Sequence, residues 1–450
     1  MIQLGPDPFC IIFEKMFAPV ANFFHFCVYA FVKRFKNNKV YHVKVLKMKK
    51  ILLPIVLAAA LVTAIASAQT LKDKPEKIVT FIKTKYDTEW YKRQATLWEK
   101  EVKKNPDNDD AWYYWFEATR YYMMFDEADE DVSDKALTDI LYRLHKERPN
   151  SYARYVIDYE CSHFISYKNT PKDLQDNMLK AMQMRPDFEP MFPKYVVYLQ
   201  QTGRTDLLPG VLKPWYESGD YSYATLAFFY NALAGMEENG ILFVGGDIDT
   251  FSSLMIQYGK GLFQDRLIIN QGLLWEPEYR KVIFSQLGIE PYEGPESFSD
   301  QKVMNQWFEN LIFYIAQNSG RAVYFACTTG QNYFKDHLYS EGLINRYSTR
   351  RYDNLAAKRR NFESVYLTDY LLESFSADTF DTIAYKVSLN YIPNFKSLLD
   401  YYKAQGLKSE YDKLRRIMIH IVDMYKENVC DPDSKEDQYL LKHYYDEIDR

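Results

Sequence analysis

Two aspartates separated by one residue form the clearest candidate for chemistry in this sequence. Asp247 and Asp249 follow the apolar run 241–246, which ends in two glycines as a buried strand entering a turn does. Open α/β sheets bind ligands at this edge, and two carboxylates there could hold a divalent cation. The same oxygens could instead cap the next helix by accepting from unpaired N–H groups. We expect Asp247 or Asp249 to act as a cap, because Asp-x-Asp has many chance matches, and retain the metal site as the alternative.

Basic side chains gather in one later stretch, interleaved with Tyr347 and Tyr352. Guanidinium groups match carboxylates and phosphates, so this stretch could hold an anionic glycan or a lipid head group. A solvated surface paired with acidic residues is the default interpretation. The stretch contains Arg346, Arg350, Arg351, Lys358, Arg359 and Arg360. Its candidate ligand contacts are Arg346, Arg350 and Arg351.

Nucleophilic catalysis has little support in the sequence. It contains no Gly-x-Ser-x-Gly elbow and no His-x-x-x-His metal spacing. The cysteines beyond residue 68 are Cys161, Cys327 and Cys430. Three widely spaced cysteines form no disulfide framework and no Cys-x-x-Cys metal pair, and whether any two of them pair stays open. We therefore expect no catalytic residue and no cofactor.

Composition narrows the class of partner. The 450 residues carry 61 acidic and 56 basic side chains. The resulting net charge of −5 disfavours nucleic acid as a binding partner. Aromatic residues make up 17% of the chain, and 39 of them are tyrosine. Tyrosine suits both the cores of packed helices and binding surfaces, because it combines a large apolar ring with a polar tip.

The first half of the chain is predicted to be helical. Between residues 79 and 235 apolar residues recur at three- and four-residue spacing between proline and glycine punctuation. Three similar turns contain Pro106, Pro149 and Pro186, and each precedes an aromatic-rich stretch. Their separation of roughly 40 residues is that of helix-pair repeats. The pattern resembles a degenerate tetratricopeptide array, whose concave surface typically binds peptides or proteins.

The middle of the chain changes pattern. Apolar runs at 241–246, 266–270 and 322–327 predict buried parallel strands, with helices at 251–260 and around 303–318. After residue 339 we expect helices at 354–373, 397–404 and 409–427. Gly406 should form the turn between the last two of these helices, and residues 431–450 should pack loosely.

The expected fold class is mainly α with a small α/β unit, in which tetratricopeptide-like helix pairs flank a short parallel sheet of about three strands. We place the helical repeats at residues 69–235, the α/β domain at 236–345 and a C-terminal helical region at 346–450.

Four segments of the middle region carry a family resemblance. They are 238–251, 265–270, 321–326 and 339–343. In this order they resemble the C-terminal region of bacterial membrane proteins similar to the transmembrane O-mannosyltransferases. The resemblance implies the fold of residues 236–345 with helical repeats on either side. It does not imply glycosyl transfer, because that chemistry resides in a polytopic membrane portion and no row of hydrophobic segments follows Ala68. Ile248 and Ser252 differ from the usual polar residue and proline of the relatives.

A leader is predicted near the start of the chain. Met48 opens a short basic segment, followed by the uncharged run 51–68 ending in Ala66-Ser67-Ala68. This is typical of a signal peptide cleaved before Gln69, although the run could also be a membrane anchor. Residues 1–47 then represent an upstream extension from a start codon assigned too early. The alternative is an anchor at 17–32 with basic residues on its cytoplasmic side.

Together these features favour a non-catalytic periplasmic or secreted protein that binds a protein or glycan partner in the cell envelope. The alternative is a metal-dependent glycan or nucleotide-sugar enzyme that uses Asp247 and Asp249.

Overall fold

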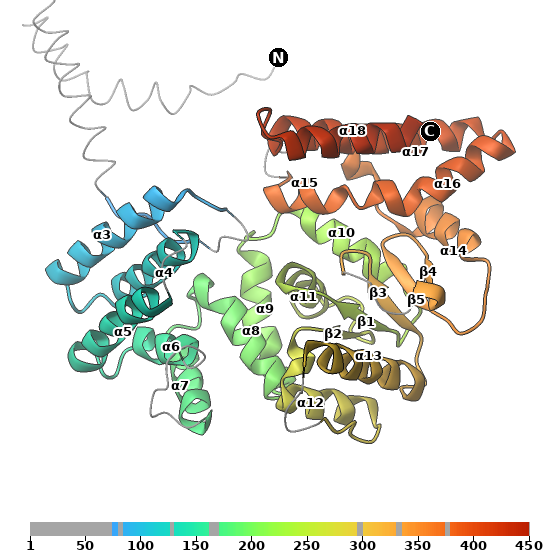
Figure 1. The fold of residues 1–450 in the computed structure, drawn as a ribbon. Coiled ribbons are helices and arrows are strands. Elements are labelled where there is room, and N and C mark those ends of the chain that lie inside the picture. Colours follow the sequence, from blue (N-terminus) through green and yellow to red (C-terminus); the bar gives the residue numbers. More distant parts are fainter. Residues whose placement is uncertain are drawn as a thin grey trace, which may run out of the picture. The chain divides into compact units, whose positions relative to one another are not determined.

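A computed structural model describes most of the chain beyond residue 73. The described residues are 74–79, 84–126, 130–161, 171–294, 300–329, 335–373 and 379–449. The chain divides after Glu76, and Lys77–Arg450 forms one compact unit, whose described helices and strands are shown in Figure 1. The predicted leader, its cleavage site and the segment 1–47 lie outside the described residues. Within the described ranges, no helix combines the length and the apolar character that crossing a membrane requires.

Helices form the first part of this unit, as predicted. They are α3 (Thr88–Lys104), α4 (Asp109–Phe125), α5 (Glu130–Glu147), α6 (Tyr152–Cys161), α7 (Pro171–Met184), α8 (Phe192–Gln201), α9 (Leu208–Glu217) and α10 (Tyr223–Ala234). The three proline turns separate α3 from α4, α5 from α6 and α7 from α8. Helix α4 begins after Asn108, whose side chain accepts from the N–H of Ala111, and such a cap fixes where a helix starts.

The sheet is mixed and has five strands among the described residues. They are β1 (Ile241–Val244), β2 (Leu267–Asn270), β3 (Val323–Ala326), β4 (Leu338–Ser340) and β5 (Ile344–Tyr347), in the order β2-β1-β3-β5-β4. The three predicted strands are present and pair in parallel. The expectation of about three strands was wrong, because β5 pairs antiparallel with β3 and with β4.

The two missed strands follow from local geometry. Gly342 has a φ of 112°, a conformation that glycine adopts without the usual steric penalty, and it lets the chain reverse between β4 and β5. Neither strand is a continuous apolar run, and β4 lies at the sheet edge with half-buried side chains. The predicted return to helix directly after residue 339 is therefore wrong.

The two faces of the sheet belong to different cores. Alternate residues of β1 point to opposite faces, so Leu242 and Val244 join the large core, whereas Ile241 and Phe243 join a smaller one. Helix α11 (Asp247–Leu254) continues into the π-helical turn Met255–Gly259 on the first face. Helices α12 (Pro277–Leu287) and α13 (Gln301–Asn318) cover the second face. Helix α12 lies in a stretch that the sequence pattern left unassigned.

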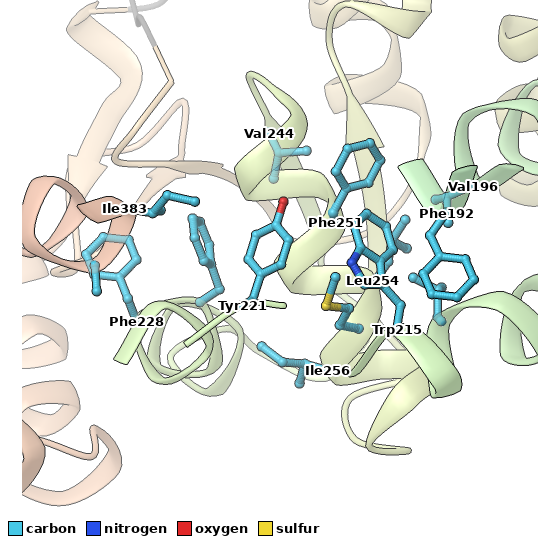
Figure 2. Packing of buried hydrophobic residues seen from close by; sticks show 14 of the residues in the cluster. Phe192, Val196, Trp215, Tyr221, Phe228, Val244, Phe251, Leu254, Ile256 and Ile383 are labelled. Atoms are coloured by element: carbon cyan, nitrogen blue, oxygen red, sulfur yellow. The ribbon is translucent and has the colours of Figure 1, made fainter. Parts of the chain in front are cut away.

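The large core continues from the helical region into the sheet. Figure 2 shows Phe251 and Leu254 of α11 beside Trp215 of α9 and Phe192 of α8, with Tyr221 toward the other side. The rings of Trp215 and Phe251 are 5.1 Å apart. Aromatic pairs at this distance contribute beyond the apolar area that they bury. This packing holds α11 against the helical region.

Helices complete the unit. They are α14 (Asn354–Arg360), α15 (Thr382–Ser388), α16 (Tyr391–Gln405), α17 (Lys408–Asn428) and α18 (Lys435–Asp449). The helices predicted around Gly406 are confirmed, and this glycine ends α16 with a φ of 68°. A single helix over 354–373 was wrong, because α14 passes into the π-helical turn Asn361–Val365 and the backbone is extended at Tyr366. Buried Asn361 in this turn donates its side-chain N–H to the backbone oxygen of Glu341. The end of the chain is not loosely packed, since α18 buries Leu441 and Ile448.

Candidate functional site

A cavity of about 720 Å³ lies in the helical region. Helices α4, α6 and α8, each of which follows one of the three proline turns, supply much of its lining. Residues 77–79, the turn before α8, Asp220 and the start of α11 supply the rest. Its volume falls within the range of small-molecule sites, so we take it as the candidate functional site.

Helix α4 provides the largest share of the wall. Tyr113, Glu117, Arg120 and Tyr121 line the cavity, and their spacing of three and four residues places them on one helix face. Beyond its first turn, the helix is mostly aromatic and apolar, so this face would be an ordinary core face without Glu117 and Arg120. Burial of such charges requires partners close by.

Lys194 of α8 joins the charges from three helices into one cluster. Its ammonium lies 2.9 Å from the Tyr113 hydroxyl and 3.4 Å from Oε1 of Glu117, and it also pairs with Glu160 of α6. Arg120 donates to Oε2 of Glu117 at 2.8 Å. We call Glu117, Arg120, Glu160 and Lys194 the buried charge cluster.

The two carboxyl groups of this cluster have opposite pKa shifts. Burial, together with the charge of Glu117, raises the pKa of Glu160 to about 7. For Glu117, burial raises the pKa, but Arg120 and Lys194 together outweigh that effect and lower it well below its ordinary value. Near neutral pH the cluster can therefore hold one proton on Glu160 beside an ionised Glu117.

Further carboxylates line the rest of the cavity. Arg185, in the third proline turn, pairs with Asp110 and lies 3.7 Å from Asp187. Glu189 and Asp247 are exposed lining residues, and neither has an ion-pair or hydrogen-bond partner for its carboxylate among the described residues. Burial raises the pKa of Asp247, and no neighbouring charge or hydrogen bond offsets that effect.

The two aspartates of the Asp-x-Asp motif have different surroundings. Asp247 lines the cavity, whereas Asp249 is buried and accepts from the Thr328 hydroxyl at 2.6 Å and the Gly245 N–H at 3.4 Å. Neither caps α11 as expected, because both lie inside the helix and its N-cap is Gly246, which has no side chain to accept from the first helical N–H groups. Asp249 bonds to the backbone ahead of the helix and ties α11 to the segment after β3. In the described part of the chain, no group of three or more His, Cys, Asp or Glu side chains could hold a metal ion.

The basic stretch is distributed over several environments. Arg346 pairs with Glu237, and Arg359 pairs with Glu363 at 2.8 Å. Lys358 is buried and donates to the Ser397 hydroxyl at 2.9 Å. Of the three candidate contacts, Arg350 and Arg351 are exposed and Arg346 is half-buried. None of these basic residues lines the cavity.

The three cysteines that the structure describes contribute no reactive site to the cavity. Cys161, Cys327 and Cys430 are free thiols, and none lines it. Burial raises the pKa of Cys161 to about 12, which disfavours the reactive thiolate.

Sequence reasoning missed the buried charge cluster. Its signal was present as isolated charges in aromatic helices: Glu117 and Arg120 in α4, Glu160 in α6 and Lys194 in α8. One such charge usually lies on a solvated face. Only the packing of three helices shows that these charges face one another.

Comparison of the chain with models of known protein families, with curated proteins and with solved structures finds no match.

Proposed function

We propose that this chain is an exported, non-catalytic binding protein of the cell envelope, whose cavity receives part of a protein or glycan partner. The observation that carries the proposal is the cavity lined by α4, α6 and α8, with charges and aromatic side chains along its wall. A charged, pre-formed hollow among packed helices suits recognition of a polar ligand.

The proposal includes a tetratricopeptide-like arrangement of the helix pairs. Contacts between successive pairs recur at nearly constant separation: Arg148 bonds to Asp109 across 39 residues, and Tyr159 bonds to Gln201 across 42. These separations are close to the 43 and 37 residues between the three turn prolines, and they support a period near 40 residues.

Export and family likeness belong to the same proposal. The segment 48–68 supports a cleaved leader, and the segments at 238–251 and 321–326 support the resemblance to the O-mannosyltransferase-like C-terminal region. Terminal sequencing of exported protein is expected to begin at Gln69. A sequence that reads through from Met1 or Met48 would exclude cleavage there.

Site-directed photo-cross-linking in native envelope tests the binding role. A photoreactive phenylalanine analogue at Glu189, on the cavity wall, should capture a partner that the same analogue at exposed Tyr439 of α18 does not. Mass spectrometry of the product identifies the partner. In a Val197→Trp background, whose added ring fills part of the cavity, capture at Glu189 should fall sharply.

Equal capture from positions 189 and 439, or capture unaffected by Val197→Trp, would contradict binding in the cavity. Circular dichroism of each variant establishes that the fold is retained.

The alternative function is a metal-dependent glycan or nucleotide-sugar enzyme. It is favoured by Asp247, which lines the same cavity. Manganese or magnesium should then raise the melting temperature of the wild type, and the Asp247→Asn, Asp249→Asn double variant should lose that gain. The binding proposal expects no metal-dependent difference between the two proteins.

A further inference from the structure

The cavity wall carries more acidic than basic side chains. Seven carboxyl groups line it, from Asp110, Glu117, Glu160, Asp187, Glu189, Asp220 and Asp247. Four basic groups line it, from Lys77, Arg120, Arg185 and Lys194. Protonation of Glu160 removes only one of the excess negative charges. A hollow lined by one sign of charge attracts ligands of the other sign.

The cations within the helical wall are already engaged by carboxylates. Arg120 is held by Glu117, Arg185 by Asp110, and Lys194 by both carboxyl groups of the buried charge cluster. These three cations therefore do not neutralise the remaining acids. Asp247 and Glu189 are left without a cation or a hydrogen-bond donor among the described residues.

Asp247 is the lining carboxylate that most clearly lacks a cationic partner among the described residues. Its side chain is exposed at the cavity wall, and desolvation by the surrounding residues raises its pKa with no offsetting charge or hydrogen bond among the described residues. An ammonium group beside this carboxylate would remove that penalty. The aromatic ring of Phe251, one turn further along α11, also lines the cavity.

Apolar side chains elsewhere on the cavity wall suit the stem of a long cationic side chain. Val197 and Pro193 of α8 are half-buried lining residues, and Tyr159 of α6 adds an aromatic face. Lysine places four methylene groups along such surfaces while its ammonium group reaches a polar partner. A sugar ring has no comparable apolar stem.

We infer that the cavity binds a lysine side chain presented by a segment of a partner protein, with its ammonium group at Asp247. The inference rests on the proposed binding function and names the chemistry of the ligand. The partner surface should accordingly be basic and extended enough to insert one side chain.

Calorimetric titration of the mature chain, at low ionic strength, tests this. The probes are an end-blocked hexapeptide alternating lysine and alanine, the same peptide with every lysine Nε-acetylated, and a chitosan trisaccharide. Acetylation keeps the stem and removes the charge, so binding should weaken about tenfold or more, as loss of a charge-assisted hydrogen bond implies. By the same argument, Asp247→Asn should weaken binding of the lysine peptide roughly three- to tenfold.

A matched variant separates the site from overall charge. Asp412→Asn on α17 changes the net charge equally at an exposed carboxylate away from the cavity, and it should leave affinity within about twofold because surface charges are screened. Glu189→Gln, a second variant of the wall, should weaken binding and covers the case in which Asp247→Asn fails to fold.

Three results would overturn the inference. They are equal binding of the acetylated peptide, equal effects of Asp247→Asn and Asp412→Asn, or tighter binding of the trisaccharide that depends on Asp247, which would indicate an amino sugar. In each case partner capture at Glu189 can still succeed, so the binding function is judged separately.

Discussion

At the scale of single residues, the buried charge cluster shows how packing sets protonation. Glu117 and Glu160 have the same functional group in the same cavity, yet Arg120 donates to Glu117 and not to Glu160. When two carboxyl groups lie this close, the negative charge of one disfavours ionisation of the other. The group with fewer cationic neighbours therefore keeps its proton. The pKa of Glu160 thus depends on where Arg120 lies.

We predict that stability falls as pH rises through the pKa of Glu160. Its folded pKa of about 7 is above the ordinary 4.5, so its contribution is full below about 4.5 and lost as pH passes 7. Denaturant unfolding of the wild type should show a loss of about 1–3 kcal/mol between pH 5 and pH 8. Glu160→Gln, which cannot ionise, should remove that loss. Glu278→Gln, at an exposed carboxylate of α12, should retain it. If the unfolding free energy of Glu160→Gln falls with pH as steeply as that of the wild type, Glu160 is not the group responsible.

Lys358 offers the opposite case of a buried cation. Burial lowers its pKa to about 8, so the folded state binds fewer protons than the unfolded state between pH 8 and 10.5. Stability should therefore rise with pH across that window. Lys358→Met should stabilise the protein at pH 7 by about 1–3 kcal/mol, because an apolar side chain avoids the desolvation cost. Lys386→Met, at an exposed site of α15, is the control and should change stability by less than about 0.5 kcal/mol. Destabilisation by Lys358→Met would show that its bond to Ser397 outweighs burial.

At the scale of elements, the end of α16 depends on one glycine. Gly406 adopts a φ of 68°, and its N–H bonds back to Lys403. Gly406→Ala should cost about 1 kcal/mol, because a β-carbon disfavours this conformation. Gly210 in α9 is helical, and a β-carbon there meets no atom within 4 Å. Gly210→Ala should stabilise by about 0.5–1 kcal/mol. Chemical denaturation measures both, and effects of the same sign would contradict the argument.

Elements with a strong local signal could be predicted from the sequence. The proline turns, the three parallel strands and the helices around Gly406 depend on local turn chemistry and continuous apolar runs. Strands β4 and β5 could not be predicted in this way. Strand β5 pairs with β3 and β4 pairs with β5, and these tertiary contacts leave only a weak local pattern in the sequence. Of the candidate site, only Asp247 was predicted. The buried charge cluster unites residues up to 77 positions apart, a separation that periodicity does not encode.

At the scale of the whole molecule, the described part of Lys77–Arg450 is joined by one large core. That core includes residues of α4, α9, α11 and α17, and it therefore crosses the predicted boundaries at 235/236 and 345/346. Regions that share a core lose their packing together. The three predicted regions therefore share packing across both boundaries.

We accordingly predict that residues 69–450 unfold in a single transition. Phe251→Ala should destabilise this segment by about 3–5 kcal/mol, because the ring fills the core between the helical region and the sheet. Far- and near-ultraviolet circular dichroism during denaturant unfolding should give coincident midpoints in both proteins. Two separate transitions, with only one shifted by Phe251→Ala, would show that the predicted domains are independent.

The hydrogen bond of Trp215 has an optical consequence. Its buried indole donates to Oδ2 of Asp220 at 2.9 Å and lies against Phe251, and both of these partners line the cavity. Indole emission responds to the electric field across the ring, so a positive charge arriving near Asp220 alters that field. The protein thus carries an intrinsic fluorophore at the wall of its own cavity, and a shift in tryptophan emission can report occupancy without a label.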